Sequence, residues 1–198
     1  MTTTPAPLDG NPKGILNGKR VLVGLTGGIA CYKTATLVSR LAQRGASVRV
    51  AMTEAATQFV TPLTFQALSG NSVLTSLWAH DDRPDSQHIG LARWCDLFVI
   101  APCSADMLGK LAGGLTPDMV SLTACALPAK TPLLVAPAMN ADMWANPIVQ
   151  RNLQTLRQTL PNWKEVGPAD GWQACRTSGA GRMSEAEEIL EAIEKHFA

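Results

Sequence analysis

Four short apolar runs dominate the hydrophobic pattern of the chain: Arg20–Leu25, Ser47–Met52, Leu97–Ala101 and Leu133–Ala136. They carry few polar interruptions, which is typical of parallel strands buried on both faces. The run Trp163–Val166 is shorter and more polar, so we predict an edge strand there. The pattern therefore predicts a parallel sheet built from short, mostly central strands.

Helical periodicity fills the segments between these runs. Apolar positions that include Val38 and Leu41 predict a helix over about residues 30–44, which Gly45 ends. Further helices are predicted around 63–68, 89–94, 107–111, 118–127 and 147–160, with loops at 81–86 and 167–181. A capping box at 184–187 begins a last amphipathic helix. This alternation predicts an α/β fold, a single doubly wound (Rossmann-like or flavodoxin-like) parallel sheet with helices on both faces.

Length and composition suit one globular domain. The chain has 198 residues, of which 46% are hydrophobic, enough for a sizeable core. We assign 18–198 to this domain and 1–17 to a flexible, Thr- and Pro-rich leader that lacks the pattern of a signal peptide. A net charge of +1 with scattered basic residues does not indicate a nucleic-acid surface. No apolar run approaches the roughly 20 residues of a membrane span.

The cysteines indicate a reduced protein. Five are present, at positions 31, 95, 103, 125 and 175. The number is odd and their spacing is not paired, so neither a disulfide framework nor a metal site is predicted, and the cytoplasm is the expected compartment. We expect Cys31, Cys95 and Cys125 to be small buried residues and Cys103 to fill a turn. Cys175 is the one cysteine outside every predicted helix and strand.

Small and hydroxylated residues follow three of the predicted strands. Gly27, Gly28 and Ile29 form a turn whose backbone amides could receive a phosphate at a helix N-terminus. Tight turns also need glycine, so phosphate binding and plain turn geometry are about equally supported here. Thr53 follows the second strand, and the block Ser104, Ala105, Asp106, Met107 follows the third. Thr53 and Ser104 have a simpler explanation as helix N-caps. The turn is not a Gly-x-Gly-x-x-Gly motif, and no acidic residue ends the second strand, which disfavours a nicotinamide cofactor.

The loop after the fourth strand carries the strongest chemical signal. It reads Pro137-Ala138-Met139-Asn140-Ala141-Asp142-Met143-Trp144. Asn140 needs partners for two donors and two acceptors. A loop at the carboxyl end of a parallel strand is where open α/β sheets bind ligands. Asn140 is therefore a candidate ligand-binding residue.

Three other residues are weaker candidates taken alone. His88 precedes the third strand, and a lone histidine is usually a surface or cap residue. Arg93 would more often be a solvated helix charge than a carboxylate ligand. Cys175 lies in a Gly-rich segment beside Arg176 and Arg182, which would favour a thiolate, although an incidental thiol is equally consistent.

Together these motifs resemble the homo-oligomeric flavin-containing cysteine decarboxylases. In chain order they are Gly27-Gly28-Ile29-Ala30, His88 with Trp94-Cys95-Asp96, the Pro-x-Met-Asn-x-x-Met-Trp block at 137–144, and Cys175 with Gly179 to Met183. The resemblance covers about residues 19–196, and the conjunction of the four is far more specific than any one of them.

The resemblance implies FMN as cofactor and assembly into trimers or dodecamers. It places Gly27, Gly28, Ile29, Thr53, Ser104, Ala105, Asp106, Met107 and Ala138 around the flavin. It makes His88 and Cys175 catalytic, and assigns Asn140, Arg93, Met143, Arg176 and Arg182 to the substrate. The implied reaction is decarboxylation of 4′-phosphopantothenoylcysteine to 4′-phosphopantetheine in coenzyme A biosynthesis.

Two departures from the family pattern keep alternatives open. Asp106 stands where the family has an amide, and Arg176-Thr177 stands where Gly-Asp is usual. One alternative is a decarboxylase of a peptide's C-terminal cysteine that stops at the enethiol, although Cys175 favours full reduction. A non-catalytic flavin-binding regulatory protein would be expected to lose His88, Asn140 or Cys175. The intact Asn140 block and Cys175 segment also weigh against a prenyl-flavin synthase.

Overall fold

The computed structural model describes residues 14–78 and 87–198. Its main sheet is parallel, with strand order β2-β1-β3-β4-β5. The strands are β1 (Arg20–Leu25), β2 (Ser47–Met52), β3 (Leu97–Cys103), β4 (Leu133–Pro137) and β5 (Trp163–Glu165). The predicted fold class is confirmed, and the observed strands match the apolar runs to within two residues at each end. The predicted loop at 81–86 lies outside the described residues.

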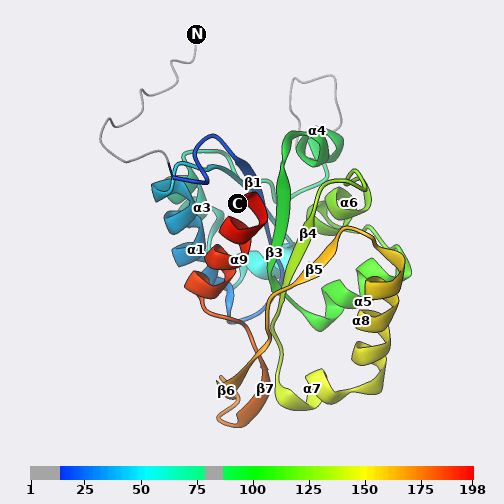
Figure 1. Ribbon diagram of the computed structural model, residues 1–198. Helices are drawn as coiled ribbons and strands as arrows, with labels where there is room; N and C mark the ends of the chain where they lie inside the picture. Colours follow the sequence, from blue (N-terminus) through cyan, green and yellow to red (C-terminus); the bar gives the residue numbers. More distant parts are fainter. Residues whose placement is uncertain (1–13, 79–86) are drawn as a thin grey trace.

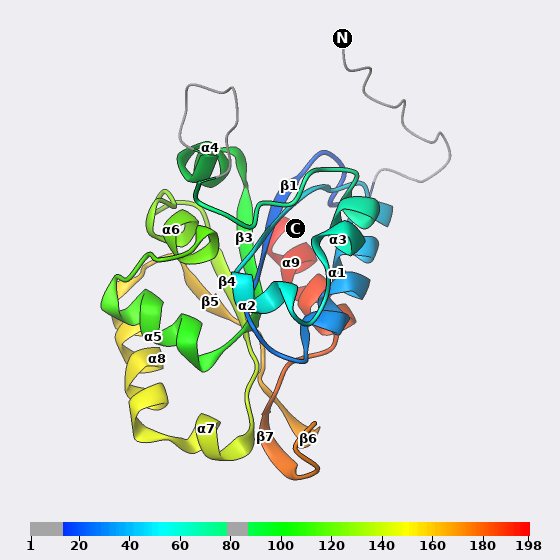
Figure 2. The same cartoon turned by 180° about the vertical axis from the view of Figure 1, so that it is seen from behind.

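Helices cover both faces of this sheet (Figures 1 and 2). On one face α1 (Cys31–Gln43), α3 (Pro62–Ser69) and α9 (Ala186–Phe197) pack around Val21, Val23 and Val99. On the other face α4 (Gln87–Trp94), α5 (Ala105–Gly113), α6 (Met119–Cys125) and α8 (Pro147–Thr159) pack around Leu22, Phe98 and Ile100. The sheet is apolar on both faces because alternate residues of each central strand feed separate cores.

Two short helices were not predicted. Helix α2 (Glu54–Thr57) follows β2, and α7 (Ala141–Ala145) lies inside the Pro-x-Met-Asn-x-x-Met-Trp block. Helices this short leave no clear 3.6-residue period in the sequence, so pattern analysis passes over them. Both begin directly after a strand-exit loop, which places them at the carboxyl edge of the sheet.

The predicted loop at 167–181 is wrong in part. It contains a β-hairpin of antiparallel strands, β6 (Ala169–Trp172) and β7 (Ser178–Arg182). The segment holds several glycines, which have low strand propensity and hide the pattern. Its pairing is set by contacts with a distant loop, described below. In Figure 1 the hairpin extends beneath the sheet beside α7.

Four smaller expectations also need correction. The final helix is capped by Glu185 with Glu188, one residue later than predicted. Cys125 is exposed rather than buried, and Cys103 ends β3 in the core rather than filling a turn. Leu16, which we assigned to the leader, is fully buried in the core, so residues 14–17 pack as part of the folded domain.

Candidate active site

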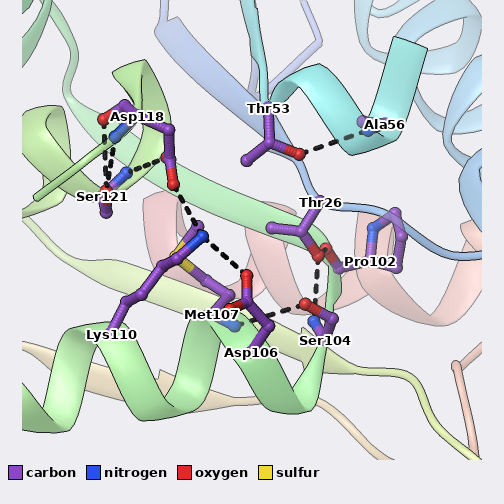
Figure 3. A network of polar contacts seen from close by, with 10 residues as sticks. All are labelled: Thr26, Thr53, Ala56, Pro102, Ser104, Asp106, Met107, Lys110, Asp118 and Ser121. Atoms are coloured by element: carbon purple, nitrogen blue, oxygen red, sulfur yellow. Dashed lines mark hydrogen bonds and ion pairs between the residues drawn. The ribbon is translucent and has the colours of Figure 1, made fainter. Parts of the chain in front are cut away.

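The turn after β1 is joined to the end of β3 by one buried threonine (Figure 3). The Thr26 hydroxyl donates to the Pro102 carbonyl at 2.7 Å and accepts from the Ser104 amide at 2.9 Å. Sequence analysis did not single out Thr26, because a threonine beside glycines reads as a turn residue. Its contacts bring two of the predicted strand-exit loops together.

Thr53 and Ser104 are N-caps, as the simpler explanation held. The Thr53 hydroxyl oxygen accepts from the Ala56 amide at 3.2 Å, and that of Ser104 accepts from the Met107 amide at 3.2 Å. Both also lie at the carboxyl edge of the sheet, as Figure 3 shows. Capping does not exclude ligand contact, because a hydroxyl oxygen has a second lone pair and a proton to donate.

Asp106 does not present an isolated negative charge. Lys110 lies one helical turn later, and its Nζ is 2.7 Å from Asp106 and 3.1 Å from Asp118 (Figure 3). Burial opposes the charge of Lys110, but its hydrogen bonds to the two carboxylates outweigh burial and raise its pKa. The i,i+4 spacing could have indicated this pair in the sequence. Lys110 thus shares its single positive charge between the two carboxylates and offsets the charge of Asp106 only in part.

Gly27 and Gly28, which follow β1, have different surroundings. A Cβ on Gly27 would lie 2.6 Å from the Ala55 Cβ, so the turn needs glycine there for packing against α2. A Cβ on Gly28 would meet nothing within 4 Å, and Ile29 is 57% exposed. Helix α1 begins at Cys31 with no side-chain cap and no acidic residue in its first turn. The amides of Cys31, Tyr32 and Lys33 donate to the carbonyls of the preceding three residues. The backbone amides left for an anion are therefore those of the turn before the helix, whose rim is apolar.

Asn140 caps α7 and retains donor capacity. Its Oδ1 accepts from the Met143 amide at 2.8 Å. Its Nδ2 has no hydrogen-bond partner within the part of the chain that the structure describes. The loop is held to the sheet because the Ala138 amide donates to the Cys103 carbonyl at 3.0 Å. The side chain of Asn140 is thus fixed through its oxygen and offers its NH₂ group to a ligand.

The hairpin that carries Cys175 docks on the Asn140 loop. The Met139 amide donates to the Gly181 carbonyl at 2.9 Å. Gly181 has φ +117°, and a Cβ there would lie 2.6 Å from the Met139 carbonyl oxygen. Only glycine allows this approach. Two motifs that lie far apart in the sequence are therefore adjacent in the fold.

Cys175 lies exposed in the turn of the hairpin. Its Sγ is 2.9 Å from the Thr177 hydroxyl. The neighbouring Arg176 has φ +66°, a left-handed conformation that costs a non-glycine residue about 1–2 kcal/mol. Burial raises the pKa of Cys31 to about 11 and that of Cys95 to about 12, so neither is a ready nucleophile or proton donor.

Arg182 is engaged at the base of the hairpin. Its guanidinium lies 3.0 Å from Glu185, which also lies 2.8 Å from Lys33. Lys33 is nearly buried and donates as well to the Met183 carbonyl at 3.1 Å. The hydrogen bond from Lys33 lowers the pKa of Glu185 below its ordinary value of 4.5. Arg176, in contrast, has no ion-pair partner among the described residues.

Glu185→Gln is expected to reduce the acid sensitivity of the fold. Because the pKa of Glu185 is lowered in the folded state, its pairing with Lys33 is complete above about pH 4.5 and is lost as pH falls through the folded-state value. The variant should unfold more easily than the parent at pH 7, and the difference should vanish in acid. Urea unfolding of both proteins at several pH values measures this, with Glu191→Gln as the control, since Glu191 is exposed on α9 and has no ion-pair partner among the described residues. An equal difference at all pH values would contradict the expectation.

The structure does not bring His88 and Arg93 close to Asn140 and Cys175. Both lie on α4, whose end is tied to the start of β1 by the bond from the Asp96 amide to the Arg20 carbonyl, 2.8 Å. Helix α4 therefore lies at the amino ends of the strands, and Figures 1 and 2 show it at the opposite end of the sheet from α7 and the hairpin. A strand of seven residues spans roughly 20 Å. Within one chain, His88 is thus separated from Asn140 and Cys175.

Comparison with known proteins identifies the family of the chain. The model of the Flavoprotein family matches residues 10–198. The chain belongs to the Flavoprotein family. It is 45% identical over 184 residues to the coenzyme A biosynthesis bifunctional protein CoaBC of Bacillus subtilis (strain 168), covering 93% of this chain and 44% of that protein. The chain therefore spans about half the length of the curated relatives it matches.

Solved structures of this family share the fold. A PPC decarboxylase mutant complexed with pantothenoylaminoethenethiol superposes with a TM-score of 0.80 at 31% identity, covering 91% of this chain and 99% of that one. The FMN-dependent cysteine decarboxylase SpaF superposes with a TM-score of 0.78 at 26% identity, covering 92% and 98%. The chain therefore shares its overall fold with both structures.

The carboxyl edge of the sheet fits a flavin. The turn before α1 offers backbone amides to an anionic group, the space over Gly28 is open, and Ile29 supplies exposed apolar surface. These features match a planar ring system with a phosphate-bearing tail. Within residues 14–78 and 87–198, no group of three or more His, Cys, Asp or Glu side chains could hold a metal ion, and no helix is long and apolar enough to cross a membrane.

Proposed function

We propose that this chain catalyses the FMN-dependent decarboxylation of 4′-phosphopantothenoylcysteine to 4′-phosphopantetheine, a step of coenzyme A biosynthesis, and works in the cytoplasm. The observation that carries the proposal is the docking of the Cys175 hairpin on the Asn140 loop, through the 2.9 Å bond from Met139 to Gly181. It joins a carboxylate-binding amide to a thiol at the edge that fits the flavin. The identity with a coenzyme A biosynthesis protein over 93% of the chain supports the choice of substrate.

The roles of the residues follow from the chemistry of the substrate. A carboxylate on a saturated carbon cannot leave, because the resulting carbanion has nowhere to delocalise. When bound, FMN would supply the two-electron oxidation of the substrate's thiol carbon to a thioaldehyde, whose C=S group accepts the electrons released with CO₂, and would then return the two electrons as a hydride to the decarboxylated product. Asn140 holds the carboxylate through its free NH₂ group and so fixes the substrate beside the ring. Cys175 donates the proton that completes the saturated thiol.

The remaining site residues are assigned either to the cofactor or to the substrate. Gly28 and Ile29 line the flavin ring, with Thr53, Ser104, Ala105, Asp106 and Ala138 around the rest of the cofactor, while Gly27 shapes the turn. Met107, which the resemblance also assigned to the flavin, is fully buried in the core and acts only through its amide, which donates to Ser104. Met143, which is 46% exposed, borders the substrate. Arg176 is the cation available for the substrate phosphate, since Arg182 is engaged with Glu185.

A second copy of the chain would complete the site. His88 and Arg93 lie at the far end of the sheet from Asn140, so one chain does not gather all the proposed catalytic groups. Assembly into a trimer or dodecamer would allow α4 of one copy to lie against the carboxyl edge of another. His88 would then act as base for the substrate thiol, and Arg93 would assist Asn140 with the carboxylate.

Mass spectrometry of the product tests the proposed reaction. The purified protein, loaded with FMN, is incubated anaerobically with 4′-phosphopantothenoylcysteine. We expect a product lighter by CO₂ alone, which is the saturated thiol. A product lighter by CO₂ and two hydrogens would exclude the reductive half of the reaction. No turnover, together with turnover of a peptide ending in cysteine, would replace the proposal with the peptide decarboxylase alternative.

Asn140→Asp is expected to lower kcat/KM for the cysteine substrate by roughly a hundredfold. Aspartate keeps the N-cap of α7, because its carboxylate can accept from the Met143 amide as the asparagine does. It also replaces the free NH₂ group by negative charge that repels the substrate carboxylate. Steady-state kinetics and thermal unfolding should show lost activity with little change in stability. Unchanged kcat/KM would remove Asn140 from carboxylate binding.

A further inference from the structure

Gln173 is a buried amide in the segment between the two hairpin strands. It follows β6 directly and is only 7% exposed, although the turn beyond it carries exposed residues such as Cys175. A buried polar side chain in a short exposed hairpin is costly unless its hydrogen bonds are made. Nothing in the sequence distinguishes it, since glutamine in a Gly-rich segment is usually solvated.

Both the nitrogen and the oxygen of the Gln173 side-chain amide make hydrogen bonds. Its Nε2 donates to the Gly179 carbonyl at 3.2 Å and to the Ala180 carbonyl at 3.0 Å, both on β7. Its Oε1 accepts from the Ala141 amide at 3.0 Å, in the first turn of α7. One side chain thus joins the hairpin to the helix that Asn140 caps.

Gln173 also sets the position of the turn that bears the thiol. Its backbone amide donates to the Thr177 carbonyl at 2.8 Å, and its carbonyl accepts from the Arg176 amide at 2.9 Å, so both ends of the turn are bonded to this residue. Its side-chain Oε1 lies 3.7 Å from the Cys175 Sγ, the outer limit for a hydrogen bond from a thiol. The same oxygen therefore faces the Ala141 amide and the thiol.

We propose that Gln173 is a positioning residue that locks the Cys175 turn onto the Asn140 loop, so that the thiol and the carboxylate-binding amide act on one substrate. The proposal rests on the proposed function for its catalytic consequence, but its structural consequence can be measured without substrate. The backbones of β7 and the start of α7 lie close together where β7 carries glycine: a Cβ on Gly179 would lie 2.8 Å from the Ala141 Cβ. The amide of Gln173 is then the side chain that holds the two backbones together.

Hydrogen exchange of the FMN-loaded protein tests the lock directly. The reporters are the Met139 and Ala141 amides, which donate from the Asn140 loop to Gly181 and Gln173 of the hairpin segment. In Gln173→Leu, which keeps the size and removes both polar ends, protection of these amides should fall by roughly tenfold or more. The matched control is Gln150→Leu, which removes a glutamine bond to the Trp144 carbonyl at the other end of α7. It should leave both reporters unchanged.

A second variant distinguishes loss of the Gln173 hydrogen bonds from a general loss of packing. In Gln173→Glu the ionised carboxylate would face two carbonyl oxygens, so the lock should fail near neutral pH. Once protonated, the same group donates again, and protection should return as pH falls from about 8 to about 5. Gln173→Leu should show no such recovery. Unchanged protection in Gln173→Leu, or no recovery in Gln173→Glu, would overturn the proposal.

The product distribution tests the catalytic consequence. Because Cys175 is misplaced in Gln173→Leu, the fraction of product released as the enethiol, two hydrogens short of the saturated thiol, should rise roughly tenfold. Gln150→Leu should release the same product mixture as the parent. An unchanged fraction in a variant that has lost protection would show that Gln173 does not act through Cys175. If the parent protein itself turned over no cysteine substrate, the proposed function would fail, whereas the exchange result would still decide the lock.

Discussion

His88→Asn is expected to abolish reduction of the flavin by substrate, lowering its rate by roughly a thousandfold or more, while leaving the flavin bound. The reason is that asparagine keeps a polar side chain of similar length but cannot take a proton from the substrate thiol. His88 lies on α4 and is proposed to contact the substrate thiol of a neighbouring copy rather than the flavin, so cofactor binding should not change. Anaerobic stopped-flow absorbance at the flavin band measures the rate, and the spectrum before mixing measures flavin content. A variant that still bleaches its flavin at the parental rate would exclude His88 as the base.

The same variant tests the shared site. His88→Asn should be inactive alone, and Asn140→Asp should keep only about a hundredth of the parental kcat/KM. If His88 of one copy serves the Asn140 loop of another, co-expression of the two variants should restore part of the activity, because some sites then receive both native residues. Gel filtration of the mixture checks that mixed assemblies form. Absence of activity in such assemblies would mean that one chain supplies both groups, against the separation seen in Figures 1 and 2.

Cys175→Ser is expected to change the product rather than stop the reaction. The oxidation and the loss of CO₂ do not need this thiol, so both should proceed at rates near the parental ones. A hydroxyl is a far weaker acid than a thiol, so delivery of the last proton should slow by roughly a hundredfold or more and the enethiol should escape. Anaerobic incubation followed by mass spectrometry should therefore show product lighter by CO₂ and two hydrogens.

The exposed Cys125 provides the matched control for this prediction. It lies at the end of α6 and takes no part in the proposed site. Cys125→Ser should give the saturated thiol as the parent does. If Cys175→Ser also formed the saturated thiol at the normal rate, the proton would have another source, and the role of the hairpin would be limited to covering the substrate.

The sheet and its strand-exit loops were predictable because their signals are local. The runs that became β1 and β2 are continuous and apolar, and they begin and end where predicted. The convergence of Thr53 and Ser104 followed from one rule, since parallel strands that alternate with helices leave their carboxyl ends on one edge. Asn140 could be singled out because an amide at such an exit needs partners.

The hairpin and its contacts were not predictable, because they depend on backbone groups far apart in the sequence. Gly179 and Gly181 read as loop residues until the carbonyl of Met139 and the Cβ of Ala141 are seen against them. Gln173 carries no sequence signal at all, since its burial is created by those same distant neighbours.

The sequence by itself determined which residues could carry chemistry and on which strand exits they lie, because strand formation and N-capping are set within a few residues. Only the tertiary structure decided which candidates meet. It joined Cys175 to the Asn140 loop, paired Asp106 with Lys110, and left α4, which carries His88, at the other end of the sheet. These outcomes depend on non-local packing, in which close backbone approach and shared hydrogen bonds form only once the sheet has brought distant segments together.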